Sequence, residues 1–408
     1  MKICIAQSES LKGKVQQNIQ NHLQLIERAI ALNSDLIIFP ELSITGYEPK
    51  LAKELATNIE NAMFDPFQKL SDKGNITIGI GMPTHGVEGL HISMLIFQPE
   101  TPRTVYSKQR LHEDEKPYFV GGTYQTYLYI KETKIALGIC FETLQQDHFF
   151  NAVQNGAALY IASVAKSKGG IDKAYARFPK MANKFNTPIL MSNSVGFCDN
   201  FLSIGRSAVW HPNGDLIAQL DDDNQGLLIY DVDKSTVEID QFNICIGQLS
   251  DLEAVFHMYL NGKHDLERHG IYQWTDHYPT NALIKNDLKK GTLYILKNAN
   301  LLIGAISISE EQEKAYESIT WEFDATKVLV IHRLIVDPKH QHRGHAKRLM
   351  DFAENFAKEH NYTSIRLDAY SPNTRVLKFY KKRHYIIRGN VNFPKREHVF
   401  YCMEKALL

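Results

Sequence analysis

Apolar and polar positions alternate at the start of the chain and then change to a helical period. The first nine residues alternate as a strand does, and apolar side chains next return every three or four residues, which predicts a helix over about 14–32. The unbroken apolar run SDLIIFPE (34–41) is typical of a strand buried on both faces, and Pro40 ends it. A strand, a helix and a buried strand in this order indicate an α/β fold.

Segments with the alternation of a strand and segments with the spacing of a helix follow one another to about residue 232. They predict strands at 75–83, 94–98, 134–141, 158–165, 188–195, 207–211 and 226–232, and helices at 144–155 and 172–186. The periodicity lapses over 233–242, and NICIGQL then has the pattern of a fresh strand. We therefore place a domain boundary near residue 240, which gives domains at 1–240 and 241–408.

The C-terminal part has the pattern of a second α/β domain. After a first helix it is predicted to contain strands at 292–297, 302–309 and 328–337, a helix, a strand at 364–370, a helix from about 373 and a late strand HVFYCME. Strands and helices of this number favour a central sheet with helices packed on it.

Composition narrows the class of protein. The 408 residues are 44% hydrophobic and 23% charged, enough for two or three domains with filled cores, which argues against a disordered or fibrous chain. Lys and Arg (46) balance Asp and Glu (46), so the net charge favours neither nucleic acid nor a membrane as a partner. The five cysteines are scattered without a C-x-x-C pair, which argues against a disulfide framework and a metal site. With neither a signal peptide nor a membrane-spanning run in the sequence, we expect a cytoplasmic protein.

A first group of polar residues follows the predicted strands. Cys140 ends the apolar run KIALGIC, and active sites of α/β sheets lie at strand ends. A thiol becomes a nucleophile when a base or cation favours its thiolate. Glu41 could take the proton, Lys108 could stabilise an oxyanion, and Glu115 could assist it or orient water. Taken alone, a buried cysteine is usually an unreactive core residue, and a carboxylate at the end of a strand is usually a cap or part of an ion pair. Together, these residues predict a nucleophilic site.

Four segments, in order, resemble the carbon-nitrogen hydrolase (nitrilase) superfamily over about residues 1–235. They are FPELSITGY, YSKQRLHEDEKPYFVGG, ALGICFE and GRSAVWHPNG. The resemblance implies a four-layer αββα sandwich in which Glu41 is the base, Lys108 supports the oxyanion and Cys140 attacks an amide or nitrile carbon. It also implies a homodimer or higher homo-oligomer formed through this domain.

The resemblance places the second family glutamate at Glu115, and Glu113 is the alternative register. Two departures from the family pattern concern the substrate pocket. Cys-Phe-Glu stands where many members have Cys-Tyr-Asp or Cys-Tyr-Glu, and SVAKS (163–167) stands where many have a loop with a tryptophan.

A second group of residues lies between a predicted strand and a predicted helix. In DPKHQHRGHAKRLM, consecutive backbone N–H groups could face a pyrophosphate at the N-terminus of the helix, although a basic surface turn would have the same composition. Downstream, SIRLDAYSPNTRVLKFYKKRHY adds a strand, a helix opened by Asn373, and Tyr380.

These segments resemble the GNAT acetyltransferase superfamily, over about 243–408. The resemblance implies that acetyl-CoA binds through its pantetheine, its pyrophosphate and Asn373, and that Tyr380 protonates the leaving thiolate, although a tyrosine there could also be core. The residues implied to bind the cofactor are Leu334, Ile335, Val336, Gln341, His342, Arg343, Gly344, His345, Ala346, Lys347 and Asn373.

Three further residues bear on this second domain. His332 and Asp368 are candidate bases for an acceptor amine, although each is more often a satisfied strand residue. His384 stands where the family usually has glycine before its last aromatic residue, so a residue poorly suited to positive φ would fill a bent position.

The two resemblances together predict a bifunctional enzyme. It would hydrolyse a small-molecule amide or nitrile without a cofactor, and it would transfer an acetyl group from acetyl-CoA to a small-molecule amine. One alternative is a catalytically silent hydrolase domain that serves as a dimerisation scaffold for an active acetyltransferase. Another is an acyl-CoA or metabolite sensor built from two inactive domains. Neither substrate is identified by the sequence.

Overall fold

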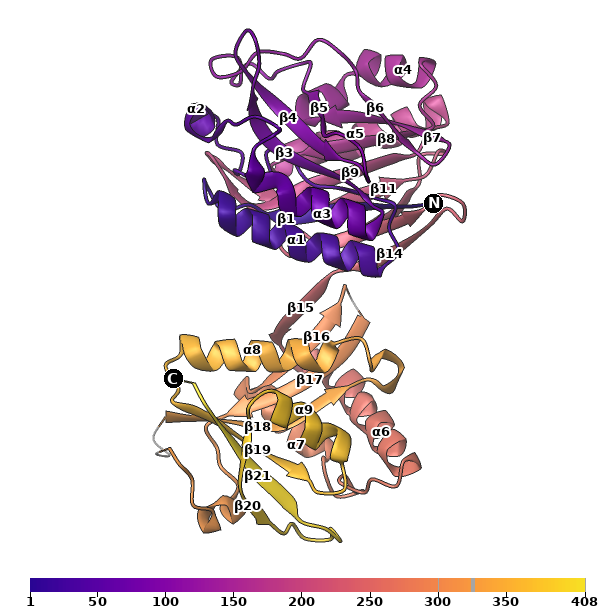
Figure 1. Ribbon diagram of the computed structural model, residues 1–408. Coiled ribbons are helices and arrows are strands. Elements are labelled where there is room, and N and C mark those ends of the chain that lie inside the picture. The colour runs from indigo at the N-terminus through magenta and orange to yellow at the C-terminus, as the bar shows by residue number, and fades with distance from the viewer. Residues whose placement is uncertain (300, 324–326, 408) are drawn as a thin grey trace. The chain divides into compact units, whose positions relative to one another are not determined.

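The computed structural model describes residues 1–299, 301–323 and 327–407 (Figure 1). The chain divides into two compact units, Met1–Phe242 and Asn243–Leu408, and each unit has its own sheet. Within the described ranges, no helix has the length and apolar character needed to cross a membrane.

A curled sheet organises the first unit. Its strands are β1 (Lys2–Glu9), β2 (Leu36–Ile38), β3 (Thr77–His85), β4 (Leu90–Phe97), β5 (Thr104–Ser107), β6 (Tyr127–Ile130), β7 (Thr133–Ile139), β8 (Leu159–Val164), β9 (Ile189–Cys198), β10 (Phe201–Ile204), β11 (Ala208–Trp210), β12 (Leu216–Gln219), β13 (Gly226–Asp231) and β14 (Thr236–Asp240). The main path runs β5-β4-β3-β2-β1-β9-β8-β7-β6, and β13 pairs with both β1 and β14.

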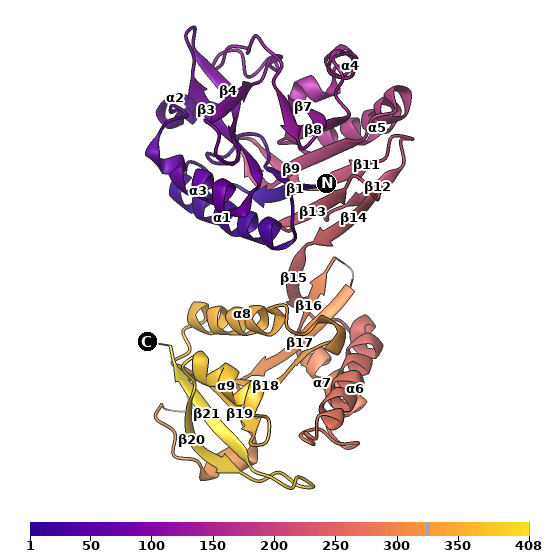
Figure 2. The same ribbon diagram turned by 45° about the vertical axis from the view of Figure 1, so that its right-hand side comes forward.

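The sheet folds into two halves that meet at one corner. β1 pairs with β9 over Ser8↔Ser194 and Glu9↔Val195, whereas it pairs with β13 from Lys2 to Gln7. The described helices of this unit are α1 (Val15–Ala31), α2 (Ala52–Leu55), α3 (Asp65–Gly74), α4 (Gln146–Gln154) and α5 (Lys168–Phe185). Figure 2 shows α1 and α3 against one half of the sheet and α4 and α5 against the other.

Three apolar clusters fill the spaces between these layers. Cys4 and Ile37 pack under α1 and α3, while Ala162 and Met191 pack under α4 and α5. Between the two halves lies a third cluster that contains Ile5. Neighbouring residues of a strand face opposite sides, so Cys4 and Ile5 serve two different cores. Four layers with the order helix, sheet, sheet, helix confirm the predicted αββα sandwich.

A mixed sheet organises the second unit. Its strands are β15 (Phe242–Ile246), β16 (Leu293–Asn298), β17 (Leu301–Ser309), β18 (Val328–Val336), β19 (Ser364–Tyr370), β20 (Ile386–Val391) and β21 (Phe400–Ala406), in the order β15-β16-β17-β18-β19-β21-β20. β18 and β19 are parallel, whereas β17 is antiparallel to β18 and β21 to β19.

Helices cover both faces of this second sheet. They are α6 (Leu252–Arg268), α7 (Asn281–Lys290), α8 (His345–Glu359) and α9 (Thr374–Lys382). Ala305 of β17 belongs to the cluster formed with α6 and α7, whereas a Cβ at the adjacent Gly304 would lie 3.0 Å from Leu349 Cδ1 of α8. Because adjacent strand residues face opposite sides, α8 packs on the other face. This arrangement confirms the predicted α/β domain with a central mixed sheet.

The elements that the pattern does not predict are short or polar. They are β5, β6, β10, β12, β14 and β20, together with α2, α3 and α7. β14 lies within the segment 233–242 where we expect no regular element; Thr236 and Glu238 are exposed along it, whereas Val237 and Ile239 are half-buried and pack against the core. Two apolar positions in five residues are too short a pattern to predict a strand.

Candidate active sites

Cys140 lies where β7 turns into a short 3-10 helix, Cys140–Leu144. Its φ is +47°, a left-handed conformation that side chains with a Cβ rarely adopt. The residue is half-buried, and its Sγ lies 3.8 Å from the Ala165 carbonyl oxygen and 3.8 Å from Lys166 Nζ. Backbone strain of this kind concentrates at functional sites.

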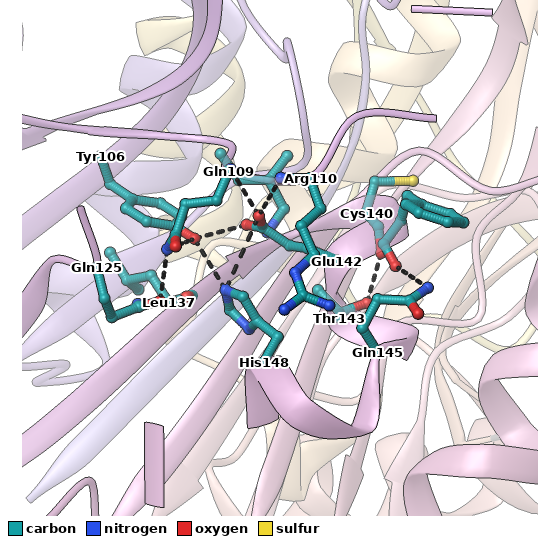
Figure 3. Close-up of polar contacts among 12 residues, drawn as sticks. Tyr106, Gln109, Arg110, Gln125, Leu137, Cys140, Glu142, Thr143, Gln145 and His148 are labelled. Atoms are coloured by element: carbon teal, nitrogen blue, oxygen red, sulfur yellow. Dashed lines mark hydrogen bonds and ion pairs between the residues drawn. The ribbon is translucent and has the colours of Figure 1, made fainter. Parts of the chain in front are cut away.

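The fully buried Glu142 carboxylate ties this turn to the segment that follows Lys108 (Figure 3). Its four donors are the backbone N–H groups of Ile139 (2.7 Å), Gln109 (2.7 Å) and Arg110 (3.2 Å) and the hydroxyl of Tyr106 (2.6 Å). A buried carboxylate is stable only when its oxygens are hydrogen-bonded, so these contacts hold the Cys140 turn and the Lys108 segment together. Glu142 has no predicted role; its signal in the sequence is a charged residue directly after an apolar strand.

Lys108 is completely buried between two carboxylates. Its Nζ lies 2.8 Å from Glu41 Oε1 and 2.6 Å from Glu115 Oε1. Burial by itself would lower the pKa of Lys108, but Glu41, the Cys140 thiolate and Glu115 raise this pKa above its ordinary value. The ammonium group therefore keeps its charge in the absence of water.

The structure places Glu115, and not Glu113, beside Lys108. Glu115 is 1% exposed and also accepts hydrogen bonds from the Tyr47 hydroxyl (2.9 Å) and the His112 N–H (2.7 Å). Glu113 is exposed and contacts Lys116 Nζ at 2.6 Å on the surface. Of the two registers that the sequence leaves open, the geometry favours Glu115.

The electrostatics of the pair formed by Glu41 and Cys140 suit a proton transfer. Burial raises the pKa of Glu41 to about 7, although Lys108 acts in the opposite direction. Burial and Glu41 raise the pKa of the Cys140 thiol to about 11, while Lys166 and Lys108 act to lower it. At neutral pH the thiol is thus protonated, and Glu41 titrates where a general base works best.

Gly81 of β3 lets the Glu41 loop approach the sheet. The Gly81 carbonyl accepts a hydrogen bond from the N–H of Ile44 (3.0 Å). A Cβ at Gly81 would lie 2.2 Å from the backbone nitrogen of Leu42 and 2.6 Å from the carbonyl oxygen of Pro40. These atoms flank Glu41 on the backbone, so they cannot move away without displacing its carboxylate.

The second unit contains a cavity of about 910 Å³. β18 pairs with β19 from Val328↔Ser364 to Ile331↔Leu367, and Leu334–Val336 lie beyond the paired part and line the cavity. The backbone of these three residues is bonded to β17 on one side, and its other edge faces the cavity. Such an edge can pair with an extended ligand.

The loop before α8 lines the same cavity. The predicted residues found there are Gln341, His342, Gly344, His345, Ala346 and Lys347. Gly344 has φ +82° at the N-cap of α8, and a Cβ there would meet no atom within 4 Å. The N-terminus of a 15-residue helix next to open space suits an anion. Arg343 is exposed and is not one of the cavity-lining residues.

Asn373 and Tyr380 reach the cavity from α9. Asn373 Oδ1 accepts a hydrogen bond from Val376 N (3.2 Å) and so caps the helix, while its Nδ2 donates to Gln273 Oε1 (2.9 Å). Burial and the nearby Asp368 raise the pKa of the Tyr380 hydroxyl above its ordinary value. This hydroxyl therefore stays protonated and can act as an acid.

The two candidate bases also line this cavity. Burial and Arg333 lower the pKa of His332 to about 4, so its imidazole is neutral at pH 7. Burial raises the pKa of Asp368 to about 6, and its Oδ2 accepts a hydrogen bond from the Tyr316 hydroxyl at 2.7 Å. His384, outside the cavity, has φ +67°, which confirms the predicted bent position.

Residues 2–240 match the carbon-nitrogen hydrolase family, and residues 254–385 match the acetyltransferase (GNAT) family. These matches confirm both resemblances seen in the sequence. In the described part of the chain, no three His, Cys, Asp or Glu side chains are grouped as a metal site would require.

Similar proteins match about half of the chain. A glutamine-dependent NAD(+) synthetase from Synechocystis is 24% identical over 56% of this chain and 46% of its own length, so the chain spans about half the length of that relative. A probable nitrilase from Schizosaccharomyces pombe is 25% identical over 54% of this chain and 84% of its own length. An amidase from Nesterenkonia sp. AN1 has the same fold, with a TM-score of 0.53, 21% identity and coverage of 57% of this chain and 92% of that structure.

We expect Gly81→Ala to impair hydrolysis more than Gly79→Ala does. A Cβ at Gly79 would press on the side chains of Ile38 and Met94, which can rotate, whereas a Cβ at Gly81 would press on backbone. Overpacking typically destabilises by about 1–3 kcal/mol, and Gly81→Ala should reach the upper end of that range. Urea unfolding and amide turnover of the two variants would measure this, and equal effects would contradict the positioning role of Gly81.

Proposed function

Because the chain belongs to the carbon-nitrogen hydrolase family through residues 2–240 and carries a GNAT acetyltransferase domain at 254–385, we propose that it is a bifunctional enzyme. Its first domain, 1–240, hydrolyses a C–N bond of a small-molecule amide or nitrile. Its second domain, 241–408, transfers an acetyl group from acetyl-CoA to a small-molecule amine. The observation that carries the first activity is the buried Lys108 between Glu41 and Glu115, at the site of Cys140.

In the first half of the hydrolysis of an amide, Glu41 takes the thiol proton while Cys140 Sγ forms a bond to the amide carbon. The carbonyl oxygen becomes an oxyanion, which the Lys108 ammonium stabilises. When this intermediate collapses, the C–N bond breaks and the proton held by Glu41 goes to the departing nitrogen. An acyl thioester on Cys140 remains.

In the second half, water attacks the thioester and gives up a proton to Glu41. The C–S bond breaks, the carboxylic acid leaves, and the thiol recovers its proton. Glu115 has two roles in this scheme: its contact with Lys108 keeps the ammonium in place, and its carboxylate orients the attacking water. Lys108 contacts two buried carboxylates. When Glu41 takes up a proton, the ammonium group therefore keeps its ion pair with Glu115.

The cavity of the second unit fits acetyl-CoA. Leu334–Val336 offer a backbone edge to the pantetheine, and Gln341 to Lys347, with the N–H of Arg343, offer the start of α8 to the pyrophosphate. The open space at Gly344 leaves room for phosphate oxygens. Acetyl-CoA supplies an activated acetyl thioester. His332 or Asp368 would take the proton of the acceptor amine, and Tyr380 would protonate the leaving thiolate.

The proposal also includes a homodimer or higher homo-oligomer formed through the first domain, by analogy with its family. A silent first domain that acts only as a scaffold would form the same assembly. Amide hydrolysis that depends on Cys140 would distinguish an active hydrolase domain from a silent scaffold.

Replacement of Cys140 by serine tests the hydrolase. Cys140→Ser should reduce amide hydrolysis by on the order of 10³-fold or more, because serine is a far weaker nucleophile without a stronger base. Acetyl transfer should not change. The matched control is Cys198→Ser, which alters a buried thiol elsewhere in the same domain and should retain turnover. Ammonia release across a panel of small amides measures the first activity and CoA release the second; retained ammonia release in Cys140→Ser would remove this residue from the mechanism.

The pH dependence of hydrolysis should report Glu41. Glu41 accepts a proton only when it is ionised, and its pKa is raised to about 7. We therefore expect kcat/KM to be low at pH 5 and to rise as the pH passes through about 7. Glu113→Gln should leave this profile intact, since Glu113 lies on the surface. A flat profile between pH 5 and pH 8 would exclude Glu41 as the base.

A glutamate at position 344 should prevent binding of acetyl-CoA. Its side chain would fill the open space at the start of α8 and place a negative charge beside the phosphates, which costs several kcal/mol and predicts a loss of about 100-fold or more. Gly156→Glu is the matched control, because Gly156 also has positive φ (+84°) and open space but lies in the first unit. Calorimetry with acetyl-CoA compares the two; unchanged affinity in Gly344→Glu would place the phosphate site elsewhere.

A further inference from the structure

Lys166 is a second lysine at the nucleophile, and its environment differs from that of Lys108. It follows β8, is 5% exposed, and places its Nζ 3.8 Å from Cys140 Sγ. Lys108 contacts two carboxylates, whereas no carboxylate of the described residues lies within 4.0 Å of Lys166 Nζ. Lys166 belongs to SVAKS (163–167), the segment that stands where many family members have a loop with a tryptophan.

The chain holds Lys166 firmly in this position. Its backbone N–H donates to Asn193 Oδ1 (2.8 Å), and its carbonyl accepts a hydrogen bond from Ser203 Oγ (3.1 Å). Its aliphatic stem passes Gly170 of α5, where a Cβ would lie 3.1 Å from Lys166 Cβ and 3.3 Å from its Cγ. The glycine leaves room for the stem, so the ammonium group is directed at the thiol.

A buried cation without a carboxylate partner is costly unless an anion arrives to pair with it. The Cys140 thiol does not serve as that anion in the resting enzyme, because it is protonated at neutral pH. During hydrolysis the reacting carbon bonds to Sγ, so a group that contacts Nζ must be separated from this carbon by only a few bonds. An anionic substituent close to the amide carbon meets this condition.

We propose that Lys166 binds a carboxylate on the acyl part of the substrate, so that the hydrolase domain acts on monoamides of short dicarboxylic acids in preference to neutral amides. This inference rests on the proposed hydrolase function and extends it to a class of substrate. Lys166 thus determines specificity, while Lys108 stabilises the oxyanion. The products would be ammonia and a short dicarboxylate.

Alkylation of Cys140 by iodoacetate and by iodoacetamide tests this inference without an identified substrate. In both reagents Sγ displaces iodide from a CH₂ group and the thiol proton leaves, but only iodoacetate carries a carboxylate on the reacting carbon. Rates are followed by mass spectrometry of the Cys140 peptide and divided by those of free cysteine. The wild-type chain should favour iodoacetate, and Lys166→Met should lower that preference by about tenfold, the loss of one charge-assisted contact.

Lys166→Met keeps the stem that packs on Gly170 and removes the charge. Lys168→Met, an exposed lysine two residues further on, is the matched control and should keep the wild-type preference. Equal slowing of both reagents in Lys166→Met would identify Lys166 as a counter-ion of the thiolate and overturn the inference. Unchanged rates with both reagents would also overturn it.

Turnover then separates this inference from the proposed function. Oxamate, malonamate and succinamate are compared with their neutral diamides, and Lys166→Met should lower kcat/KM about tenfold or more for the acids alone. A preference for neutral diamides in the wild-type chain would reject the carboxylate site while leaving the hydrolase in place. Absence of turnover with every amide, together with a Lys166-dependent preference for iodoacetate, would reject the hydrolase function and retain the anion site.

Discussion

The buried ammonium of Lys108 is the interaction on which the rest of the first unit depends. It lies 2.8 Å and 2.6 Å from two carboxylates that come from different loops, and all three side chains are excluded from water. Removing one member of such a group typically costs about 3–5 kcal/mol, because the remaining charges lose their partner. The close approach at Gly81 and the Glu142 network have one common effect: they keep the loops that supply these charges in contact.

The sequence indicates the residues that the structure brings together around Lys108, because each follows an apolar strand or lies in a recognisable segment. Glu41 and Cys140 end buried strands, and the strand ends of an α/β sheet meet at one edge. Glu142 and Lys166 also follow apolar strands, but their roles depend on distances across the fold, and Gly81 has no signal in the sequence. The choice between Glu115 and Glu113 also needed the structure, because burial of one carboxylate and exposure of the other cannot be read from two glutamates two residues apart.

In the second unit, too, the sequence reveals local features and misses those that depend on contacts across the fold. The loop before α8 and Asn373 are evident in the sequence, because a basic segment between strand and helix and a helix cap are local features. The separation of β18 from β19 after Ile331 is not local, and it creates the edge that faces the cavity. The electrostatics of His332 and Asp368 likewise follow from burial, which the sequence does not show, and for Asp368 also from its contact with Tyr316, 52 residues away in the chain.

The raised pKa of the Cys140 thiol has a consequence for the durability of the enzyme. Peroxides oxidise thiolates and react slowly with thiols, so a nucleophile that stays protonated between turnovers is shielded from damage. Cys140 is more exposed than Cys4, Cys198 and Cys402, which are buried, and would otherwise be more open to oxidation than they are. In the proposed mechanism, a thiol that loses its proton only when a substrate is bound would be reactive in turnover and slow to oxidise at rest.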